Sequence, residues 1–267
     1  MSRWIEGDVV ANGIRLHYYR TGGDKPQVVL SHGFSDSSLC WPRVGEALDA
    51  DYDVVTYDAR GHGRSEAPDG GYDSESRAAD LAELIKALGL NQPAIVGHSM
   101  GASTTLYCAA LYPALVSRAV LEDGGPRGAS RLNPAWASAM HDRVRALREM
   151  TQEQLIAVCR EESPTWDEAE LAPWAEAKRL LSPNAIGRPF GTEKLTWQEA
   201  IARISCPTLL ITADNDRGSG VTPEAASEAQ RLLPSLRVVH ISGAGHNVRR
   251  EQFATFVETV RSFLAEA

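Results

Sequence analysis

The pentapeptide at residues 97–101 (GHSMG) most constrains what this chain can fold into. A short apolar run at residues 93–96 (PAIV) precedes it, and a helical pattern over residues 102–111 follows it. A strand that turns sharply through G-x-S-x-G into a helix strains the backbone of the serine, and small residues beside it let backbone segments approach closely. The Ser99 hydroxyl would then project into a pocket at the positive end of the helix. This context predicts a nucleophile elbow at Ser99.

Strands and helices alternate along most of the chain. Apolar runs that suit buried strands occupy residues 28–30, 54–57, 119–121, 208–212 and 238–241. Helical periodicity marks residues 74–90 and 253–264, and Asn12-Gly13 joins two short strands near the N-terminus in a hairpin. This order predicts a mainly parallel sheet that is covered by helices on both faces and opened by an antiparallel hairpin.

Residues 128–203 interrupt the alternation. They contain no convincing strand and hold four of the six tryptophans. Helical stretches lie near residues 135–150, 152–159 and 174–181. A helical insertion at the carboxyl side of a parallel sheet lies over the crevice where ligands bind, so we expect a cap domain here. The predicted domains are the core at 1–127 and 204–267 and the cap at 128–203. Most aromatic side chains of the cap should pack, while Trp136 and Met140 are expected to bind substrate.

The composition limits the kinds of partner. The 267 residues are 43% hydrophobic and carry a formal net charge of −8, from 27 basic and 35 acidic residues, so nonspecific binding to nucleic acid is not expected. The four cysteines lack metal-ligand spacing, which favours free thiols in a reducing compartment. There is no apolar signal core and no run of membrane-spanning length. We therefore expect a soluble, cytoplasmic monomer or homodimer that acts on a small molecule and binds no membrane.

A serine hydroxyl is a weak nucleophile at neutral pH and needs a base that is itself oriented by an acid. Of the seven histidines, His246 stands in a glycine-rich loop at residues 243–247 (GAGHN), directly after the last predicted strand. Such a loop lets the imidazole swing back over the carboxyl edge of the sheet, so His246 is the predicted base. His98 neighbours the serine on a tight turn and should point away from it.

The acid is expected in the loop at residues 212–218 (TADNDRG), after the next-to-last strand. Asp216 is the first candidate, and Asp214 is the alternative. Glu122 and Asp123, at the end of the strand that precedes the cap, are further candidates. Carboxylates that do not take this role are expected to lie in loops exposed to water.

The negative charge that develops on the substrate oxygen needs two preorganised backbone N–H donors. Met100, at the start of the helix, is expected to supply one, and Phe34, after the strand at residues 28–30, the other. The Phe34 ring could also line the substrate pocket, while His32 should support its loop by hydrogen bonding. The loop at residues 58–65 (DARGHGRS) is expected to tie loops together rather than to contact substrate.

In this order, the residues resemble the α/β-hydrolase superfamily over nearly the whole chain. The matching segments are residues 32–34 (HGF), 58–65, 97–101, the loop with Asp214 and Asp216, and Gly245-His246. The resemblance implies the α/β-hydrolase fold, a mostly parallel eight-stranded sheet with helices on both faces and a helical cap. It also implies an enzyme without cofactor or metal, with Ser99 as nucleophile, His246 as base and Asp216 as acid. Ala213 replaces the family's usual glycine three residues before the acid, which keeps Asp214 open beside Asp216.

The residue type at the elbow also distinguishes between the reactions that enzymes of this fold catalyse. Haloalkane dehalogenases and epoxide hydrolases carry an aspartate there, so Ser99 argues against both. We expect a capped serine hydrolase of the esterase or lactonase type, which cleaves a carboxylic ester or lactone of a small, largely apolar substrate through an acyl-enzyme. The alternative is hydrolysis of a carbon–carbon bond in a vinylogous diketone by the same triad. A non-catalytic receptor or a cofactor-free lyase on this fold is the remaining hypothesis.

Overall fold

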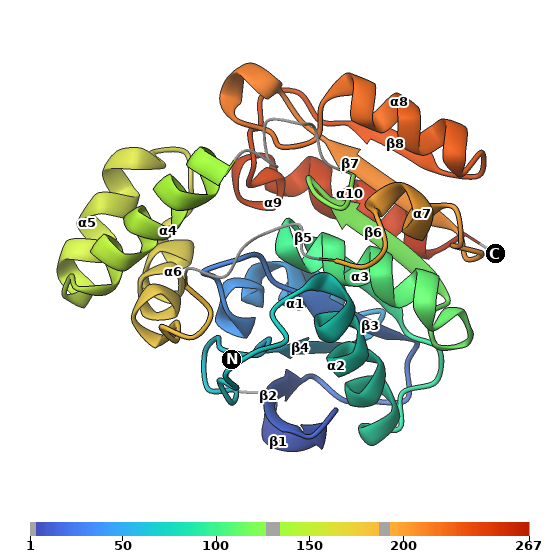
Figure 1. The fold of residues 1–267 in the computed structure, drawn as a ribbon, viewed down its shortest axis with the longest axis horizontal. Coiled ribbons are helices and arrows are strands. Elements are labelled where there is room, and N and C mark those ends of the chain that lie inside the picture. The colour runs from blue at the N-terminus through green and yellow to red at the C-terminus, as the bar shows by residue number, and fades with distance from the viewer. Residues whose placement is uncertain (1–3, 127–133, 187–192, 267) are drawn as a thin grey trace.

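A mostly parallel β-sheet forms the centre of the molecule (Figure 1). The structure is a computed structural model and describes residues 4–126, 134–186 and 193–266. Within these residues, eight strands pair in the order β1 (Ile5–Ala11), β2 (Ile14–Arg20), β4 (Asp53–Tyr57), β3 (Gln27–Ser31), β5 (Ala94–His98), β6 (Arg118–Glu122), β7 (Thr208–Thr212) and β8 (Arg237–His240). β2 runs antiparallel to β1 and to β4, and all the other neighbours are parallel. The predicted sheet architecture is confirmed.

Local sequence explains how the sheet begins and why its centre is apolar. Asn12 and Gly13 adopt φ values of 50° and 78°, as a tight hairpin turn requires, and they bring Ala11 opposite Ile14. All five residues of β5 are buried, because helices cover the sheet on both sides. The hydrophobic run before the elbow is therefore a strand of the sheet interior.

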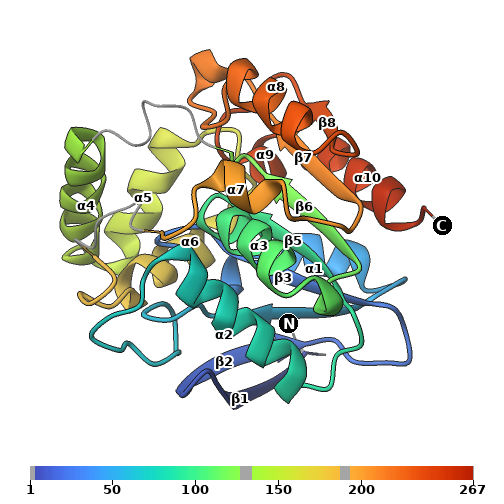
Figure 2. The ribbon, with the colours of Figure 1, turned by 45° about the vertical axis from the view of Figure 1, so that its right-hand side comes forward.

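Helices pack on both faces of the sheet (Figure 2). One face carries α1 (Pro42–Leu48) and α10 (Phe253–Leu264), and the other carries α2 (Ser74–Ala87), α3 (Met100–Leu111), α7 (Trp197–Ile201) and α8 (Pro223–Leu232). The shorter elements are α9 (Val248–Glu251), η1 (Ser38–Cys40), η2 (Pro113–Leu115) and η4 (Asn215–Arg217). Along β3, Val28 and Leu30 join the core of the first face and Val29 joins the core of the second, as the two-residue period of a strand requires.

Three further helices form a lobe of their own. They are α4 (Pro134–Arg148), α5 (Gln152–Glu162) and α6 (Glu168–Leu180), and they stand beside the sheet in Figure 1. Leu147 and Trp174 belong to the hydrophobic core of this lobe. α7 also falls in the range 128–203, but it packs against α3, and Trp197 is part of the main core. Among the described helices of that range, the ones that stand apart from the sheet are therefore α4, α5 and α6. None of the described helices combines the length and apolar composition needed to cross a membrane.

Candidate active site

Ser99 lies on a sharp turn between β5 and α3. Its φ of 51° and ψ of −108° are strained for a residue with a side chain. A Cβ atom on Gly97 would lie 2.3 Å from the carbonyl oxygen of Gly101, and a Cβ atom on Gly101 would lie 2.0 Å from the carbonyl oxygen of Ser31. Because these distances leave no room for a side chain, the two glycines let strand, turn and helix approach closely enough to form the elbow.

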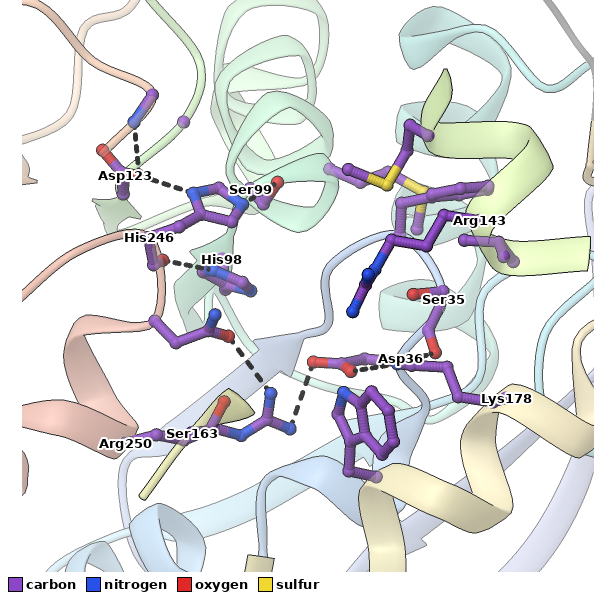
Figure 3. Close-up of a pocket in the computed structure, with 18 of the residues that line it drawn as sticks. Ser35, Asp36, His98, Ser99, Asp123, Arg143, Ser163, Lys178, His246 and Arg250 are labelled. Atoms are coloured by element: carbon purple, nitrogen blue, oxygen red, sulfur yellow. Dashed lines mark hydrogen bonds and ion pairs between the residues drawn. The ribbon is translucent and has the colours of Figure 1, made fainter. Parts of the chain in front are cut away.

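A hydrogen-bonded chain links Ser99, His246 and Asp123 (Figure 3). The Ser99 Oγ lies 3.0 Å from His246 Nε2, and His246 Nδ1 lies 2.5 Å from Asp123 Oδ2. With the ring proton on Nδ1, the imidazole donates to the carboxylate and accepts the serine hydroxyl hydrogen. This is the geometry that a general base needs to activate a serine nucleophile.

The carboxylate in contact with the base is Asp123 and not Asp216. Asp216 is exposed in η4, while Asp214 accepts hydrogen bonds from His240 Nε2 at 2.9 Å and from the Gly243 N–H at 2.7 Å. The expectation that Asp216, or alternatively Asp214, would orient the base is therefore corrected. β6 lies directly beside β5 in the sheet, so the residue that follows β6 ends next to the elbow.

The segment after β7 holds the Asp123 carboxylate in place. Ser219 Oγ donates to Oδ1 at 2.6 Å, and the N–H groups of Gly220 and Val221 donate at 2.7 and 3.1 Å. Burial raises the pKa of Asp123, but the hydrogen bond from His246, the charge of that imidazole and the donors after β7 outweigh burial. The pKa of Asp123 is consequently lowered from its ordinary value of 3.8. The group therefore stays ionised at neutral pH, as the orientation of an imidazolium requires.

A sequence signal for Asp123 exists. Gly124 and Gly125 follow it, and a Cβ atom on Gly124 would lie 2.5 Å from the carbonyl oxygen of Ser99. A carboxylate at the end of a buried strand, followed by glycines, thus marks a close approach to the elbow. Glu122, the other candidate on this strand, instead accepts a hydrogen bond from the Arg249 N–H at 2.9 Å.

Two further histidines support the loops around the site. His98 Nε2 donates to the carbonyl oxygen of His246 at 2.9 Å, and burial holds the pKa of His98 well below 6.5. The neutral His98 ring therefore holds the loop that carries His246. Its hydrogen bond goes to that loop and not to the serine hydroxyl. His32 Nε2 accepts a hydrogen bond from the Ala59 N–H at 3.0 Å, which ties its loop to the end of β4.

The loop at residues 58–65 has the structural contacts expected for it. Asp58 accepts hydrogen bonds from the Ser38 N–H and from the Arg64 N–H, both at 2.8 Å. Arg60 forms a buried ion pair with Asp80, with nitrogen–oxygen distances of 2.5 and 2.6 Å. These contacts join the loop to η1 and α2.

A cavity of about 290 Å³ opens above Ser99 between the sheet and the helical lobe. Its apolar lining comes from Phe34, Met100, Pro126, Met140, Val144, Leu147, Trp166 and Trp174. Phe34 and Met100, the predicted oxyanion donors, and Met140, a predicted substrate contact, are among the residues that line it. Trp136 belongs to α4, but its side chain lies outside the described residues.

The cavity also has a charged lining that the sequence analysis did not predict. It comprises Asp36, Arg77, Arg143, Glu162, Lys178 and Arg250. One signal was available in the sequence, because Arg143 falls three residues after Met140 and therefore on the same face of α4. The remaining charged residues belong to separate parts of the chain, and no local pattern connects them.

The buried Asp36 joins the helical lobe to the core (Figure 3). Its carboxylate lies 3.2 Å from Lys178 Nζ on α6, and 3.0 and 3.2 Å from the guanidinium groups of Arg249 and Arg250 on α9. Burial alone would raise the pKa of Asp36, but the three cations hold it well below its usual range. Arg250 also pairs with Glu170 of α6 at 3.1 Å. The charges of this cluster are therefore largely neutralised by each other.

The comparison with known proteins agrees with this geometry. A sequence model of the Alpha/beta hydrolase family matches residues 28–259. The chain belongs to the alpha/beta hydrolase family. N-formylmaleamate deformylase of Pseudomonas putida is 31% identical to this alpha/beta hydrolase over 271 residues, which cover 99% of this chain and 98% of the relative.

Two further similarities concern one kind of enzyme. 2-(Acetamidomethylene)succinate hydrolase of Mesorhizobium japonicum is 25% identical over 256 residues, which cover 92% of this chain and 90% of the relative. A crystal structure of E-2-(acetamidomethylene)succinate hydrolase superimposes with a TM-score of 0.85 at 24% identity, over 98% of this chain and 100% of that chain. The predicted fold and the predicted class are confirmed, and this alpha/beta hydrolase is a hydrolytic enzyme.

Proposed function

We propose that this alpha/beta hydrolase cleaves the bond between an acyl carbon and a conjugated leaving group in a small unsaturated acid. The leaving atom is nitrogen in the first candidate reaction and carbon in the second. The hydrogen-bonded chain from Ser99 through His246 to Asp123 supports the proposal, because all three side chains line one cavity. Acyl transfer to a serine followed by hydrolysis is the chemistry of this arrangement.

In the first step, Ser99 Oγ attacks the acyl carbon while His246 Nε2 accepts the hydroxyl proton. The backbone N–H groups of Phe34 and Met100 are the proposed donors to the oxyanion. The tetrahedral intermediate collapses, the bond to the leaving atom breaks, and that atom takes the proton from Nε2. Water then attacks the acyl carbon and gives its proton to His246 Nε2. The bond between that carbon and Ser99 Oγ breaks, Oγ takes the proton from Nε2, and the acid and free Ser99 are released.

The relatives support the alternative expectation, carbon–carbon cleavage of a vinylogous diketone, better than cleavage of an ester or lactone. The names of the relatives describe an N-formyl group on maleamate and an acetamido group on a methylene-substituted succinate. In both cases, and in a vinylogous diketone, the electron pair of the broken bond can delocalise into a conjugated system. A common triad can therefore serve nitrogen and carbon leaving groups.

The cavity agrees with a polar substrate rather than a largely apolar one. Besides Asp123, six charged side chains line it together with the apolar residues. Phe34 and Met140 are the proposed apolar contacts of the acyl group. A cytoplasmic location, a monomeric or homodimeric state, and catalysis without cofactor or metal complete the proposal.

A substrate panel tests the proposed function. It would contain N-formylmaleamate, 2-(acetamidomethylene)succinate, a vinylogous diketone, p-nitrophenyl acetate and a simple lactone. We expect kcat/KM to be highest for an N-acyl substrate and to fall by roughly 10⁴-fold or more in Ser99→Ala. The exposed Ser117 offers the control, and Ser117→Ala should keep the parental rate.

Two results would overturn the proposal. One is a higher kcat/KM for the simple ester or lactone than for every conjugated substrate. The other is unchanged turnover in Ser99→Ala. A fluorophosphonate should label Ser99 rapidly, whereas a non-catalytic receptor on this fold would not react at the rate of an aligned triad.

A further inference from the structure

We propose that the substrate binds as an anion, with a carboxylate on Arg143, and that Glu162 occupies this cation until the substrate replaces it. The inference rests on the proposed function, because it places the substrate in the cavity above Ser99. It assigns a binding role to the ion pair of Arg143 and Glu162 on the helical lobe.

The first argument is the position of Arg143 on α4. Met140, Arg143, Val144 and Leu147 all line the cavity, and their spacing places them on one face of the helix. Figure 3 shows the Arg143 side chain extending from the helix into the pocket. Arg145 does not line the cavity and pairs with Asp142 at the surface instead. Of these two arginines, Arg143 therefore faces the reaction space and Arg145 faces solvent.

The second argument is that the other cations of the cavity already have fixed partners. Lys178 Nζ donates to the Ser35 carbonyl oxygen at 2.6 Å and lies 3.2 Å from Asp36. Arg250 is paired with Asp36 and with Glu170. Removing a partner from a buried ion pair leaves an uncompensated charge, so a substrate gains little by competing for these groups.

Arg77 is similarly committed. Its guanidinium contacts the Tyr72 carbonyl oxygen, and it donates to the hydroxyl oxygens of Ser74 at 3.0 Å and Thr104 at 3.3 Å. It is buried between α2 and α3, and its donors hold the start of α2. It therefore serves the structure around the elbow.

The third argument is that the partner of Arg143 can be exchanged. Arg143 pairs with Glu162 at the end of α5, and the two side chains keep 51% and 45% of their surface exposed. An ion pair in water contributes little stability, so an incoming carboxylate can replace Glu162 at small cost. A guanidinium binds a carboxylate through two parallel N–H···O bonds, which also fixes the orientation of the ligand.

The core and the helical lobe contribute different groups to the cavity. The core supplies Ser99 at the floor, and the lobe supplies Arg143 from α4. A volume of about 290 Å³ limits the ligand to a small molecule that places its acyl group at one position and its carboxylate at the other. Arg143 thereby becomes a specificity residue, because it selects anionic over neutral acyl compounds.

The test is competitive inhibition of p-nitrophenyl acetate hydrolysis by maleate, with uncharged maleamide as the reference ligand. Arg143→Met should raise the Ki for maleate about 10- to 100-fold, the loss expected for a charge-assisted contact, while the Ki for maleamide changes much less. Arg143→Lys should give an intermediate Ki, because the charge remains and the bidentate contact is lost. Glu162→Gln should lower the Ki for maleate several-fold, because the internal competitor is removed.

Matched controls come from the same helices. Arg145→Met and Glu161→Gln change exposed residues outside the cavity and should leave the Ki for maleate unchanged. Equal Ki values for maleate in Arg143→Met and Arg145→Met would overturn this inference. If the Ki shifts appear but no N-acyl or conjugated-ketone substrate is cleaved, the proposed function fails while the carboxylate site stands.

Discussion

Ser219 Oγ donates a hydrogen bond to Asp123 Oδ1 over 2.6 Å, and this contact joins the segments that follow two neighbouring strands of the sheet at the candidate active site. Asp123 follows β6, and Ser219 follows β7. The loop after β7 therefore supplies donors to the acid instead of supplying the acid itself. His246 reaches the same carboxylate, so the position of the base depends on how this loop is built.

The first prediction distinguishes the two aspartates. Asp123→Asn should lower kcat on the order of 10⁴-fold, because an amide cannot hold the imidazole in the required tautomer or stabilise its charged form. Asp216→Asn is the control, since that side chain is exposed, and it should keep the parental kcat. Steady-state kinetics on the best substrate of the panel measures both. Full activity in Asp123→Asn would disprove the assignment of the acid.

The second prediction concerns Ser219. Ser219→Ala removes one donor from a buried carboxylate and should cost about 1.5–3 kcal/mol of unfolding free energy at pH 7. The pKa of Asp123 is lowered in the folded state, so its contribution to stability is present above its ordinary value of 3.8 and is lost as the pH falls through the folded value. The variant should therefore differ from the parent at pH 7 and much less at strongly acidic pH.

Guanidinium unfolding at a series of pH values measures this effect. Ser227→Ala offers a comparison, because Ser227 is exposed on α8 and has the same side chain. A Ser219→Ala deficit that stays constant down to strongly acidic pH would show that the hydroxyl acts by packing rather than through the Asp123 carboxylate.

The elbow and the sheet were predictable because their signals are local. The motif at residues 97–101 carries the steric requirement for glycine in its own five residues, and each strand shows its burial in a single apolar run. The base was accessible for the same reason, since the glycine-rich loop around His246 follows the last strand directly. Local patterns thus gave the order of elements, and they are the basis for proposing Ser99 as nucleophile and His246 as base.

The carboxylate that contacts His246 and the charged residues that line the cavity could not be predicted without the tertiary structure. Asp123 and Asp216 both follow parallel strands at the same edge of the sheet, and only the path of the loop after β7 decides which carboxylate meets the imidazole. Asp36, Lys178 and Arg250 come from three distant segments, so their contact is not visible before the lobe is placed on the core. Sequence periodicity reports which face of an element is buried and not which elements share that face.

The third prediction concerns the cluster around Asp36. Asp36→Asn leaves the buried charges of Lys178, Arg249 and Arg250 without their shared counter-charge. Loss of one partner from such a cluster costs about 3–5 kcal/mol, which corresponds to a fall in Tm on the order of 10 °C. The pKa of Asp36 lies well below its ordinary value, so this stabilisation is complete at neutral pH and declines only in strong acid.

Thermal unfolding at neutral pH checks the size of the effect, with Asp51→Asn as the control. Asp51 lies at the surface, where its side chain is 62% exposed, and its loss should change stability by less than about 0.5 kcal/mol. Similar Tm values for Asp36→Asn and the parent would mean that the three cations find other partners.

The fourth prediction tests the packing behind Ser99. In Gly101→Ala the new methyl group would lie 2.0 Å from the Ser31 carbonyl oxygen, and because this atom is backbone, α3 or β3 must move. We expect a loss of stability of about 1–3 kcal/mol or more and a slower reaction of Ser99 with a fluorophosphonate. Gly70→Ala is the matched control, because a Cβ atom there has no neighbour within 4 Å. Labelling rates and Tm values of the two variants should therefore separate clearly, and equal rates would show that the elbow tolerates a displaced helix.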